Sequence, residues 1–177
     1  MHASAFIVEV PEAEAHVGSL RERHDASVQL GVPAHITVLS PFMPPERIDD
    51  VVIERVRAAC ATVPAFAFEL ADVARFAATA YLAPQPAAPF VALTRALVRA
   101  FPDYPPFGGQ FETIIPHLTV AHGDAAEAER AATELAAIMR DRGPIASRCA
   151  AVTLLENSSG TWRRMHGFAL PPGPAHA

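Results

Sequence analysis

One short pattern occurs twice in this chain and constrains its fold more than any other feature. An apolar run carries a histidine and, two residues later, a threonine: His35 and Thr37 lie in GVPAHITVLSPF, and His117 and Thr119 lie in TIIPHLTVAH. Alternate side chains of a β-strand point to the same face, so each run places an imidazole beside a hydroxyl and turns the intervening apolar residues the other way. Each copy therefore predicts a strand with one apolar face and one polar face.

Proline, glycine and the hydrophobic periodicity divide the rest of the chain into similar elements around each copy. The first half is predicted to contain a strand over 5–10, a helix from Pro11, the motif strand over 35–40, a helix that Pro44 and Pro45 open and Pro64 closes, and strands over 65–76 and 79–84. The second half is predicted to contain a helix over 90–101, the motif strand over 113–122, a helix from Asp124 to Gly143, and a hairpin of strands over 147–157 and 161–170. Asp124 and Glu127 have the spacing of a capping box.

The order of these elements indicates an internal repeat. Each half runs helix, motif strand, helix and two further strands, and the two motif histidines are 82 residues apart. One unit used twice would most simply face its copy across a pseudo-two-fold axis. This arrangement would bring His35 and Thr37 opposite His117 and Thr119.

Length and composition place the chain among globular proteins. Its 177 residues, 51% of them hydrophobic, suit one compact domain or two small lobes. No run approaches the ~20 apolar residues of a membrane span, and the N-terminus MHASAFIVEV lacks the basic and apolar regions of a signal peptide. We therefore expect a cytoplasmic protein without a membrane partner. Cys60 and Cys149 form no CxxC pair and are expected to be ordinary reduced thiols.

The charged residues exclude several classes of function. The net charge is −5, and the basic residues occur singly or in twos, so binding to long duplex nucleic acid is not expected. All 14 basic residues are arginine. Without lysine the chain cannot form a P-loop, a Schiff base or a lysyl-nucleotidyl intermediate.

Two opposed imidazoles suit a reaction that removes one proton and delivers another. The ordinary pKa of histidine, near 6.5, lets one ring act as neutral base while the other acts as protonated acid. In-line phosphoryl transfer has this requirement, because the entering and leaving oxygens lie on opposite sides of phosphorus. The hydroxyls of Thr37 and Thr119 could then donate to the non-bridging oxygens. A 2′,3′-cyclic phosphate suits such a site, since water is the nucleophile and the leaving ribose hydroxyl needs a proton.

A metal site is the competing interpretation of the two histidines. Zinc or copper normally needs three or four protein ligands, and no carboxylate or thiol adjoins either motif run at a suitable spacing. We therefore expect neither a metal nor another cofactor.

The two motifs, HITV and HLTV, resemble the paired HxTx motifs of the 2H phosphoesterase superfamily, in particular its bacterial 2′-5′ RNA ligase family members. The resemblance extends from the first strand to TWRRMHGFAL. It implies a two-lobed, duplicated α+β fold with antiparallel sheets flanked by helices and a pseudo-two-fold cleft between the lobes. In this interpretation residues 1–170 form a single bilobal domain, and residues 171–177 form a disordered tail.

The resemblance also implies an activity and assigns residues to it. The activity is a metal-independent cyclic phosphodiesterase with His35 and His117 as the acid–base pair and Thr37 and Thr119 as phosphate ligands. The expected partner is a small nucleotide or an RNA end with a cyclic phosphate, bound by a monomer. Two alternatives stay open: a binding module that holds a cyclic phosphate or RNA end without turnover, and an ATP-independent 2′-5′ RNA ligase.

Some further residues could contact a nucleotide. Phe42, Tyr81 and Trp162 could stack on a base, although aromatic residues in or beside strands more often belong to the core. Arg163 and Arg164 are adjacent in the last strand, so their side chains should lie on opposite faces and at most one should reach a phosphate. The odd offset of His122 from His117 predicts that His122 lies on the face away from the site.

Overall fold

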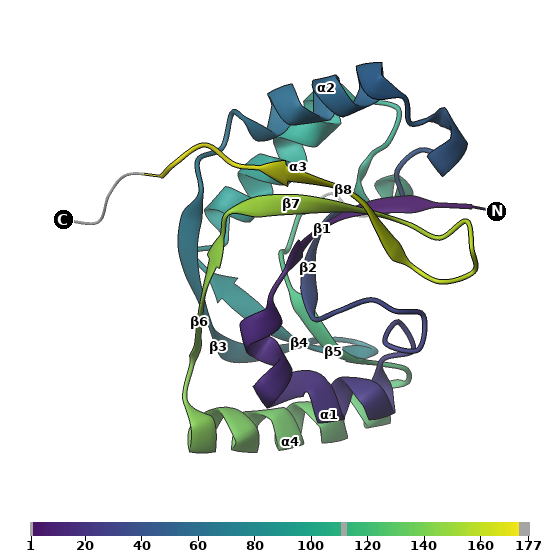
Figure 1. The fold of residues 1–177 in the computed structure, drawn as a ribbon. Coiled ribbons are helices and arrows are strands. Elements are labelled where there is room, and N and C mark those ends of the chain that lie inside the picture. Colours follow the sequence, from purple (N-terminus) through teal and green to yellow (C-terminus); the bar gives the residue numbers. More distant parts are fainter. Residues whose placement is uncertain (1, 111–112, 174–177) are drawn as a thin grey trace.

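The computed structural model describes residues 2–110 and 113–173 and has two four-stranded antiparallel sheets with helices packed around them (Figure 1). The strands are β1 (Ser4–Glu9), β2 (His35–Leu39), β3 (Phe66–Phe76), β4 (Thr79–Gln85), β5 (Leu118–His122), β6 (Ile145–Cys149), β7 (Ala151–Glu156) and β8 (Arg163–Ala169). The α-helices are α1 (Glu14–His24), α2 (Asp50–Cys60), α3 (Ala88–Ala100) and α4 (Ala125–Arg142), with short 3-10 turns η1 (Pro11–Ala13), η2 (Pro45–Arg47) and η3 (Pro106–Gly109). The predicted α+β class with antiparallel sheets is confirmed.

Each sheet combines strands from both halves of the sequence. The strand order is β2-β1-β7-β8 in one sheet and β5-β4-β3-β6 in the other, so the two motif strands, β2 and β5, are the corresponding edge strands. The prediction that each half ends in two strands is confirmed for the first half, which ends in β3 and β4, and is wrong for the second, because the run 147–157 contains two strands that belong to different sheets. β6 pairs with β3 and β7 pairs with β1, and the chain crosses between the sheets at Ala150.

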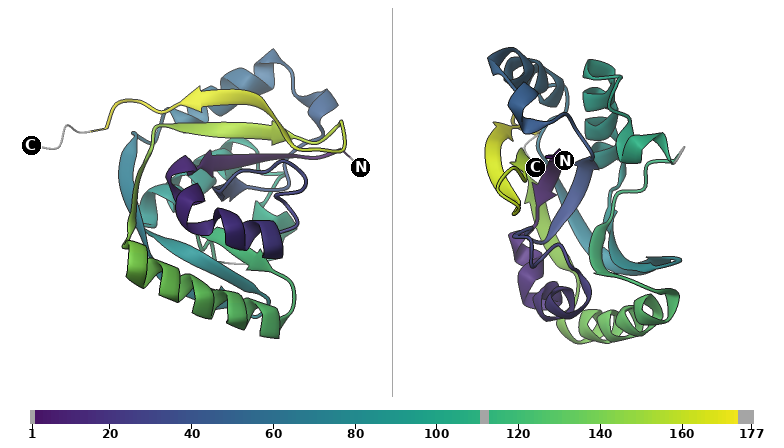
Figure 2. Two further views of the ribbon diagram at one scale, coloured as in Figure 1. Left: turned by 60° about the horizontal axis from the view of Figure 1, so that its bottom comes forward. Right: turned by 90° about the vertical axis from the view of Figure 1, so that its right-hand side faces the viewer.

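One apolar core joins the two sheets. A single cluster of buried side chains includes Phe6 and Ile36 from the first sheet and Leu70, Leu82 and Leu118 from the second. Two helix pairs enclose this core: α2 packs on α3, and α1 packs on α4 (Figure 2). The apolar face of each motif strand is therefore anchored in a core that both lobes share, and its polar face is left for other contacts.

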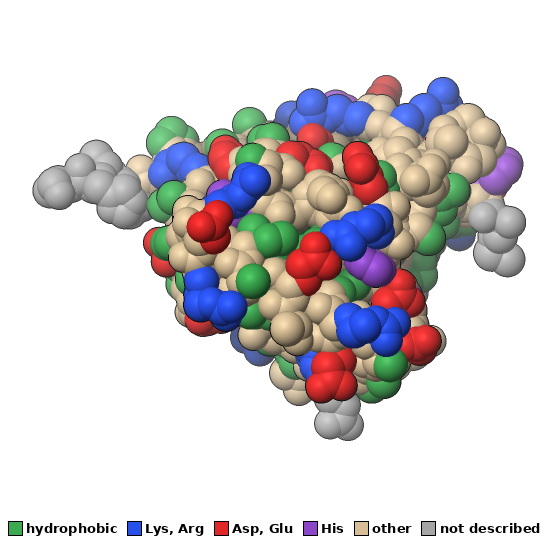
Figure 3. All heavy atoms as spheres, turned by 90° about the horizontal axis from the view of Figure 1, so that it is seen from below, with side chains coloured by type: hydrophobic (Ala, Val, Ile, Leu, Met, Phe, Trp, Pro, Cys, Tyr) green, Lys and Arg blue, Asp and Glu red, His purple; other side chains and the backbone are tan. Residues whose placement is uncertain are grey.

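Helix α1 and helix α4 are joined by polar side chains. Arg23 forms an ion pair with Glu134 (2.7 Å), and the ring of His24 contacts the Glu127 carboxylate (2.7 Å). Asp124 caps α4, as predicted, by accepting a hydrogen bond from the Glu127 backbone N–H (2.7 Å). Basic and acidic side chains are interspersed on the face that includes these helices (Figure 3), so its described residues form no continuous basic stripe.

Two predicted boundaries are corrected. Helix α2 begins at Asp50 rather than at the prolines, because Ile48 is extended and Asp49 accepts a hydrogen bond from the Val52 N–H (2.9 Å), which starts the helix there. Strand β5 begins only at Leu118, since Pro116 has no N–H to give to a strand ladder.

The last described residues come after β8 and contact the segment that precedes β3. Of the predicted tail over 171–177, Pro171 accepts a hydrogen bond from the Ala65 N–H (2.8 Å), and residues 174–177 lie outside the described residues.

Candidate functional site

Three of the four motif residues lie in β2 and β5, and the fourth, His117, directly precedes β5. β2 and β5 lie close together although they belong to different sheets. His35, Thr37, His117 and Thr119 are all partly exposed, whereas the apolar residues between and after them are buried: Ile36, Val38, Leu118 and Val120. The predicted alternation of a polar and an apolar face is thus confirmed for both runs. We call the face that carries a motif histidine and threonine the motif face.

Both histidine rings are held by the same local bond. His35 Nδ1 lies 2.8 Å from the carbonyl oxygen of Pro33, and His117 Nδ1 lies 2.7 Å from that of Ile115, two residues before the histidine in each case. A carbonyl oxygen can only accept a hydrogen bond, so Nδ1 donates in both rings. The neutral ring therefore keeps its lone pair on Nε2, the atom that can take or give a proton.

The same irregularity follows the threonine in both motif strands. Ile7 pairs with Thr37 but Phe6 pairs with Leu39, so one residue, Val38, is extra in β2. In β5, Thr119 pairs with Tyr81 and Ala121 with Ala80, so Val120 is extra in the same position. These β-bulges, which are frequent beside active sites, bend each motif strand just after its threonine.

The bulge in β5 overturns one sequence-based expectation. Thr79 and Tyr81 lie on the same face of β4, and they pair with His122 and Thr119. His122 therefore lies on the motif face together with Thr119, and the prediction that it lies on the opposite face is wrong. Its Nδ1 is 2.8 Å from the Thr79 hydroxyl, and the residue is exposed.

Burial lowers the pKa of both motif histidines. Desolvation is the largest cause for His35, and the positive charges of Arg21 and His117 lower its pKa further, whereas the Pro33 hydrogen bond and Asp25 oppose the shift. Desolvation also lowers the pKa of His117, against the effect of its own backbone hydrogen bond. Desolvation therefore favours the neutral form of both rings.

Aromatic side chains lie next to the His117 ring. The ring of His117 lies beside two aromatic side chains, with ring centroids 5.1 Å from Phe76 and 5.2 Å from Tyr81, and these two rings stack on each other at 4.5 Å. Tyr81 is buried, while Phe76 is 37% exposed. Of the other aromatic candidates, Phe42 belongs to the core and Trp162 packs on a small cluster over the first sheet. The aromatic wall beside His117 thus comes from β3 and β4.

A buried guanidinium organises the segment before His35. Arg21, only 2% exposed, donates two hydrogen bonds to Asp25 Oδ2 (both 3.1 Å), one to Ser27 (3.3 Å) and one to the carbonyl of Val32 (3.1 Å). Val32 precedes Pro33, whose carbonyl holds the His35 ring. Arg21 is therefore connected to the orientation of His35 through the backbone.

The importance of Arg21 was missed at the level of sequence. The available signal is its position: it follows Leu20 on the helix stripe that also contains the buried Val17, and it lies four residues before Asp25. An arginine on an apolar stripe with an acidic residue at that spacing indicates a buried ion pair rather than a surface charge.

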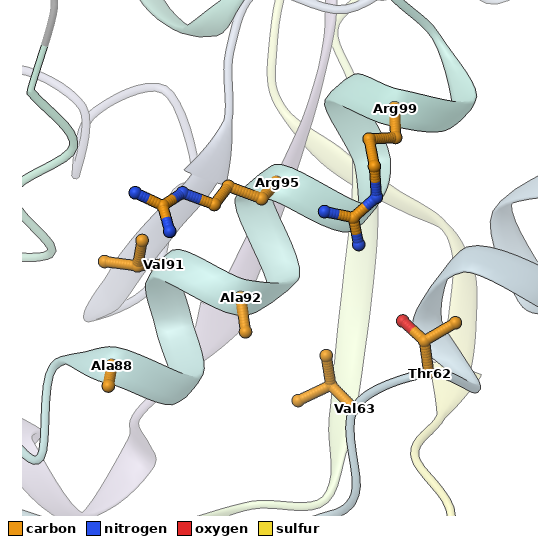
Figure 4. Close-up of a pocket in the computed structure, with 7 residues that line it drawn as sticks. All are labelled: Thr62, Val63, Ala88, Val91, Ala92, Arg95 and Arg99. Carbon is orange, nitrogen blue, oxygen red and sulfur yellow. The ribbon is translucent and has the colours of Figure 1, made fainter.

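The motif residues are part of neither a metal-ligand group nor the groove beside α3. Among residues 2–110 and 113–173, no three His, Cys, Asp or Glu side chains are grouped so that they could hold a metal ion. A groove of about 500 Å³ lies between the end of α2 and α3 (Figure 4). Its lining shares no residue with β2 or β5: Thr62, Val63, Ala88, Val91, Ala92, Arg95 and Arg99.

None of the helices in the described ranges combines the length and the apolar character that crossing a bilayer requires.

Comparison with known proteins gives one family match. A family model described as the 2′-5′ RNA ligase superfamily matches residues 9–161, which include both motifs and all of the second sheet, whereas β8 and most of β1 lie outside the match. No curated protein matches the chain.

Solved structures share the fold. E. coli LigT complexed with NADP+ has a TM-score of 0.58 at 18% sequence identity, covering 96% of this chain and 98% of that chain. E. coli LigT complexed with 3′-AMP also has a TM-score of 0.58, at 14% identity and the same coverage. The protein TT0787 of Thermus thermophilus has a TM-score of 0.62 at 16% identity, covering 97% of this chain and all (100%) of that chain. At these identities the likeness establishes the two-lobed fold alone.

Proposed function

The chain belongs to the 2′-5′ RNA ligase superfamily, and from this membership we propose that it is a phosphodiesterase that hydrolyses 2′,3′-cyclic phosphates of nucleotides or RNA ends without a metal. His35 and His117 act as general acid and base, and Thr37 and Thr119 bind the phosphate. One observation carries the proposal: two histidines, at the starts of neighbouring strands, are held by equivalent Nδ1 hydrogen bonds, so that each ring has Nε2 available for proton transfer.

The reaction needs both rings in different protonation states. The neutral ring takes a proton from water through Nε2 while the water oxygen attacks phosphorus. The bond between phosphorus and one ribose oxygen breaks, and the protonated ring gives its proton to that oxygen. The products are a ribose hydroxyl and a phosphomonoester. One proton has passed from water to the first histidine, and a second proton has passed from the other histidine to the leaving oxygen.

The threonines would stabilise charge on the phosphate. Each hydroxyl lies two residues from its histidine on the same face of the strand, where it can donate to a non-bridging oxygen. The bulge after each threonine supports this role, because it bends the strand at the residue that would meet the phosphate.

The matched structures support a nucleotide as the ligand. E. coli LigT has been solved with 3′-AMP, ATP, NADP+ and phosphate. Carried over to this chain, the likeness favours a nucleotide as the ligand.

Ligation through a 2′-5′ linkage is a second candidate, which the family description favours. The chain has no lysine, so ligation could not proceed through a lysyl-adenylate. It would have to be the ATP-independent reversal of the phosphodiesterase step, in which a ribose hydroxyl attacks the cyclic phosphate in place of water.

The test is hydrolysis of the four 2′,3′-cyclic mononucleotides and of short RNAs ending in a cyclic phosphate, with the protein treated with a chelator. We expect phosphomonoester products with chelated and untreated protein alike. Loss of activity on chelation would contradict the proposal. Tight binding without product after long incubation would instead identify a binding module, and joined RNA ends without ATP would identify the ligase.

A further inference from the structure

A polar group lies on the motif face of the first sheet, beside the motif residues. In an antiparallel sheet, residues paired across strands point to the same face. Thr37 pairs with Ile7, Ile7 with Thr153, and Thr153 with Gly167, so the face can be followed from β2 across β1 and β7 to β8. Glu9 pairs directly with His35 on the same face.

The guanidinium of Arg164 lies over this face. Arg164 Nη2 donates to the Thr153 hydroxyl (3.2 Å) and lies 3.7 Å from Glu9 Oε1, and the Thr153 hydroxyl donates to the same Glu9 oxygen (2.7 Å). A Cβ on Gly167 would meet Arg164 Nη2 at 3.4 Å, so the arm runs back across the glycine. The side chain is nevertheless 61% exposed, and among the described residues no hydrogen bond engages its Nε or Nη1.

The neighbouring arginine points the other way. Arg163 pairs with Glu156 across the hairpin and donates to its carboxylate, whereas Arg164 pairs with Leu155. Consecutive residues of a strand face opposite sides, so only Arg164 lies on the motif face. This agrees with the sequence-based expectation that at most one of the two arginines can reach a phosphate.

The position of Arg164 is suited to a phosphate next to the reacting one. Its guanidinium contacts Glu9 on β1 and Thr153 on β7, the first and second strands beyond β2. With strands about 4.8 Å apart, these contacts place it roughly 5–10 Å from β2 along the sheet. That separation is too large for a group that would lie between β2 and β5, but it suits a phosphate one nucleotide away.

Resting on the proposed function, we infer that Arg164 forms a second phosphate subsite, which binds the phosphodiester one nucleotide before the cyclic-phosphate end of an RNA chain. Glu9 and Thr153 hold one edge of the guanidinium, and its other edge is free for the phosphate oxygens. The preferred substrate class is therefore an oligoribonucleotide end rather than a free cyclic mononucleotide, which has no second phosphate to bind.

Two adjacent variants test this inference, Arg164→Gln and its matched control Arg163→Gln. We would measure kcat/KM on a 2′,3′-cyclic mononucleotide and on a trinucleotide that ends in a 2′,3′-cyclic phosphate. Arg164→Gln should lose about 10-fold on the trinucleotide, with a weaker salt dependence, and keep the wild-type value on the mononucleotide. Arg163→Gln should treat both substrates as the wild type does.

Failure of this inference can be told apart from failure of the proposed function. Equal losses on both substrates, or no loss on either, would overturn the assignment of Arg164 while leaving the phosphodiesterase intact. If the wild type hydrolyses neither substrate, the proposed function is wrong. Binding of a fluorescent trinucleotide 3′-phosphate then tests whether Arg164 forms a phosphate subsite. Binding weakened by Arg164→Gln and not by Arg163→Gln supports the subsite, and equal binding by all three proteins overturns it.

Discussion

Replacing Arg21 by methionine tests how the buried guanidinium supports both the fold and His35. Methionine fills a similar volume but removes the hydrogen bonds to Asp25, Ser27 and Val32. Among the described residues, the carboxylate of Asp25, which is 8% exposed, would keep only the hydrogen bond from the Ser27 N–H (3.0 Å). Removing one partner of a buried ion pair costs about 3–5 kcal/mol, against a total stability of about 5–15 kcal/mol for a typical protein.

The stability effect is measured by urea and thermal unfolding. For a chain of this size the expected cost corresponds to a decrease in Tm of roughly 10 °C. Arg23→Met is the matched control, because Arg23 lies on the same helix and its ion pair with Glu134 is about half exposed. An exposed ion pair contributes little to stability, so this control should unfold close to the wild type.

The same variant should change the activity in a way that loss of stability alone does not. The Arg21 guanidinium lowers the pKa of His35, so its removal should raise that pKa and move one limb of the pH profile of kcat/KM to higher pH. Looser positioning of Pro33 should also lower kcat by about 10- to 100-fold at a temperature where the variant is folded.

Arg21→Lys keeps the charge and serves as the second variant if the methionine variant does not fold. It should retain the wild-type pH profile with an intermediate kcat. Stability within about 1 kcal/mol of the wild type for Arg21→Met, or a lower kcat with an unmoved pH profile, would refute the reasoning.

Three further predictions concern other parts of the molecule. Because the pKa values of His35 and His117 are both lowered from 6.5, the pH profile of kcat/KM should be bell-shaped with its maximum below about pH 6.5. The rate should fall at higher pH because the histidine that acts as acid loses its proton, and a maximum above about pH 7 would contradict the lowered pKa values. Asp124→Ala should lower the free energy of unfolding by about 1 kcal/mol in urea, whereas Asp124→Asn should stay near the wild type; equal stabilities of all three proteins would refute the cap. Burial raises the pKa of the thiols of Cys60 to about 11 and Cys149 to about 12, so both should react with a thiol reagent only after unfolding; rapid modification of the folded protein would disprove their burial.

Much of the site follows from the sequence because it depends on local periodicity. The spacing of His35 and Thr37, and of His117 and Thr119, places each pair on one strand face wherever the strand lies. The partial exposure of these four side chains and the burial of the residues between them are confirmed. Catalytic and phosphate-binding roles for these four residues stay predictions.

The remaining features depend on long-range pairing, which local patterns do not encode. Nothing in the run 147–157 marks Ala150 as the point where the chain leaves one sheet for the other. The bulge at Val120, which turns His122 to the motif face, is set by pairing with β4, a strand about 40 residues earlier in the chain. The burial of Arg21 likewise follows from the packing of α1 against the rest of the molecule.

The most direct test of the central claim is a double-mutant comparison of kcat/KM on one cyclic-phosphate substrate for the wild type, His35→Ala, His117→Ala and the double variant. If the two rings act as an acid–base pair, each single variant loses about 10³-fold or more, and the double variant loses little beyond that. A single variant that keeps the wild-type rate would contradict the account, as would two losses that multiply in the double variant.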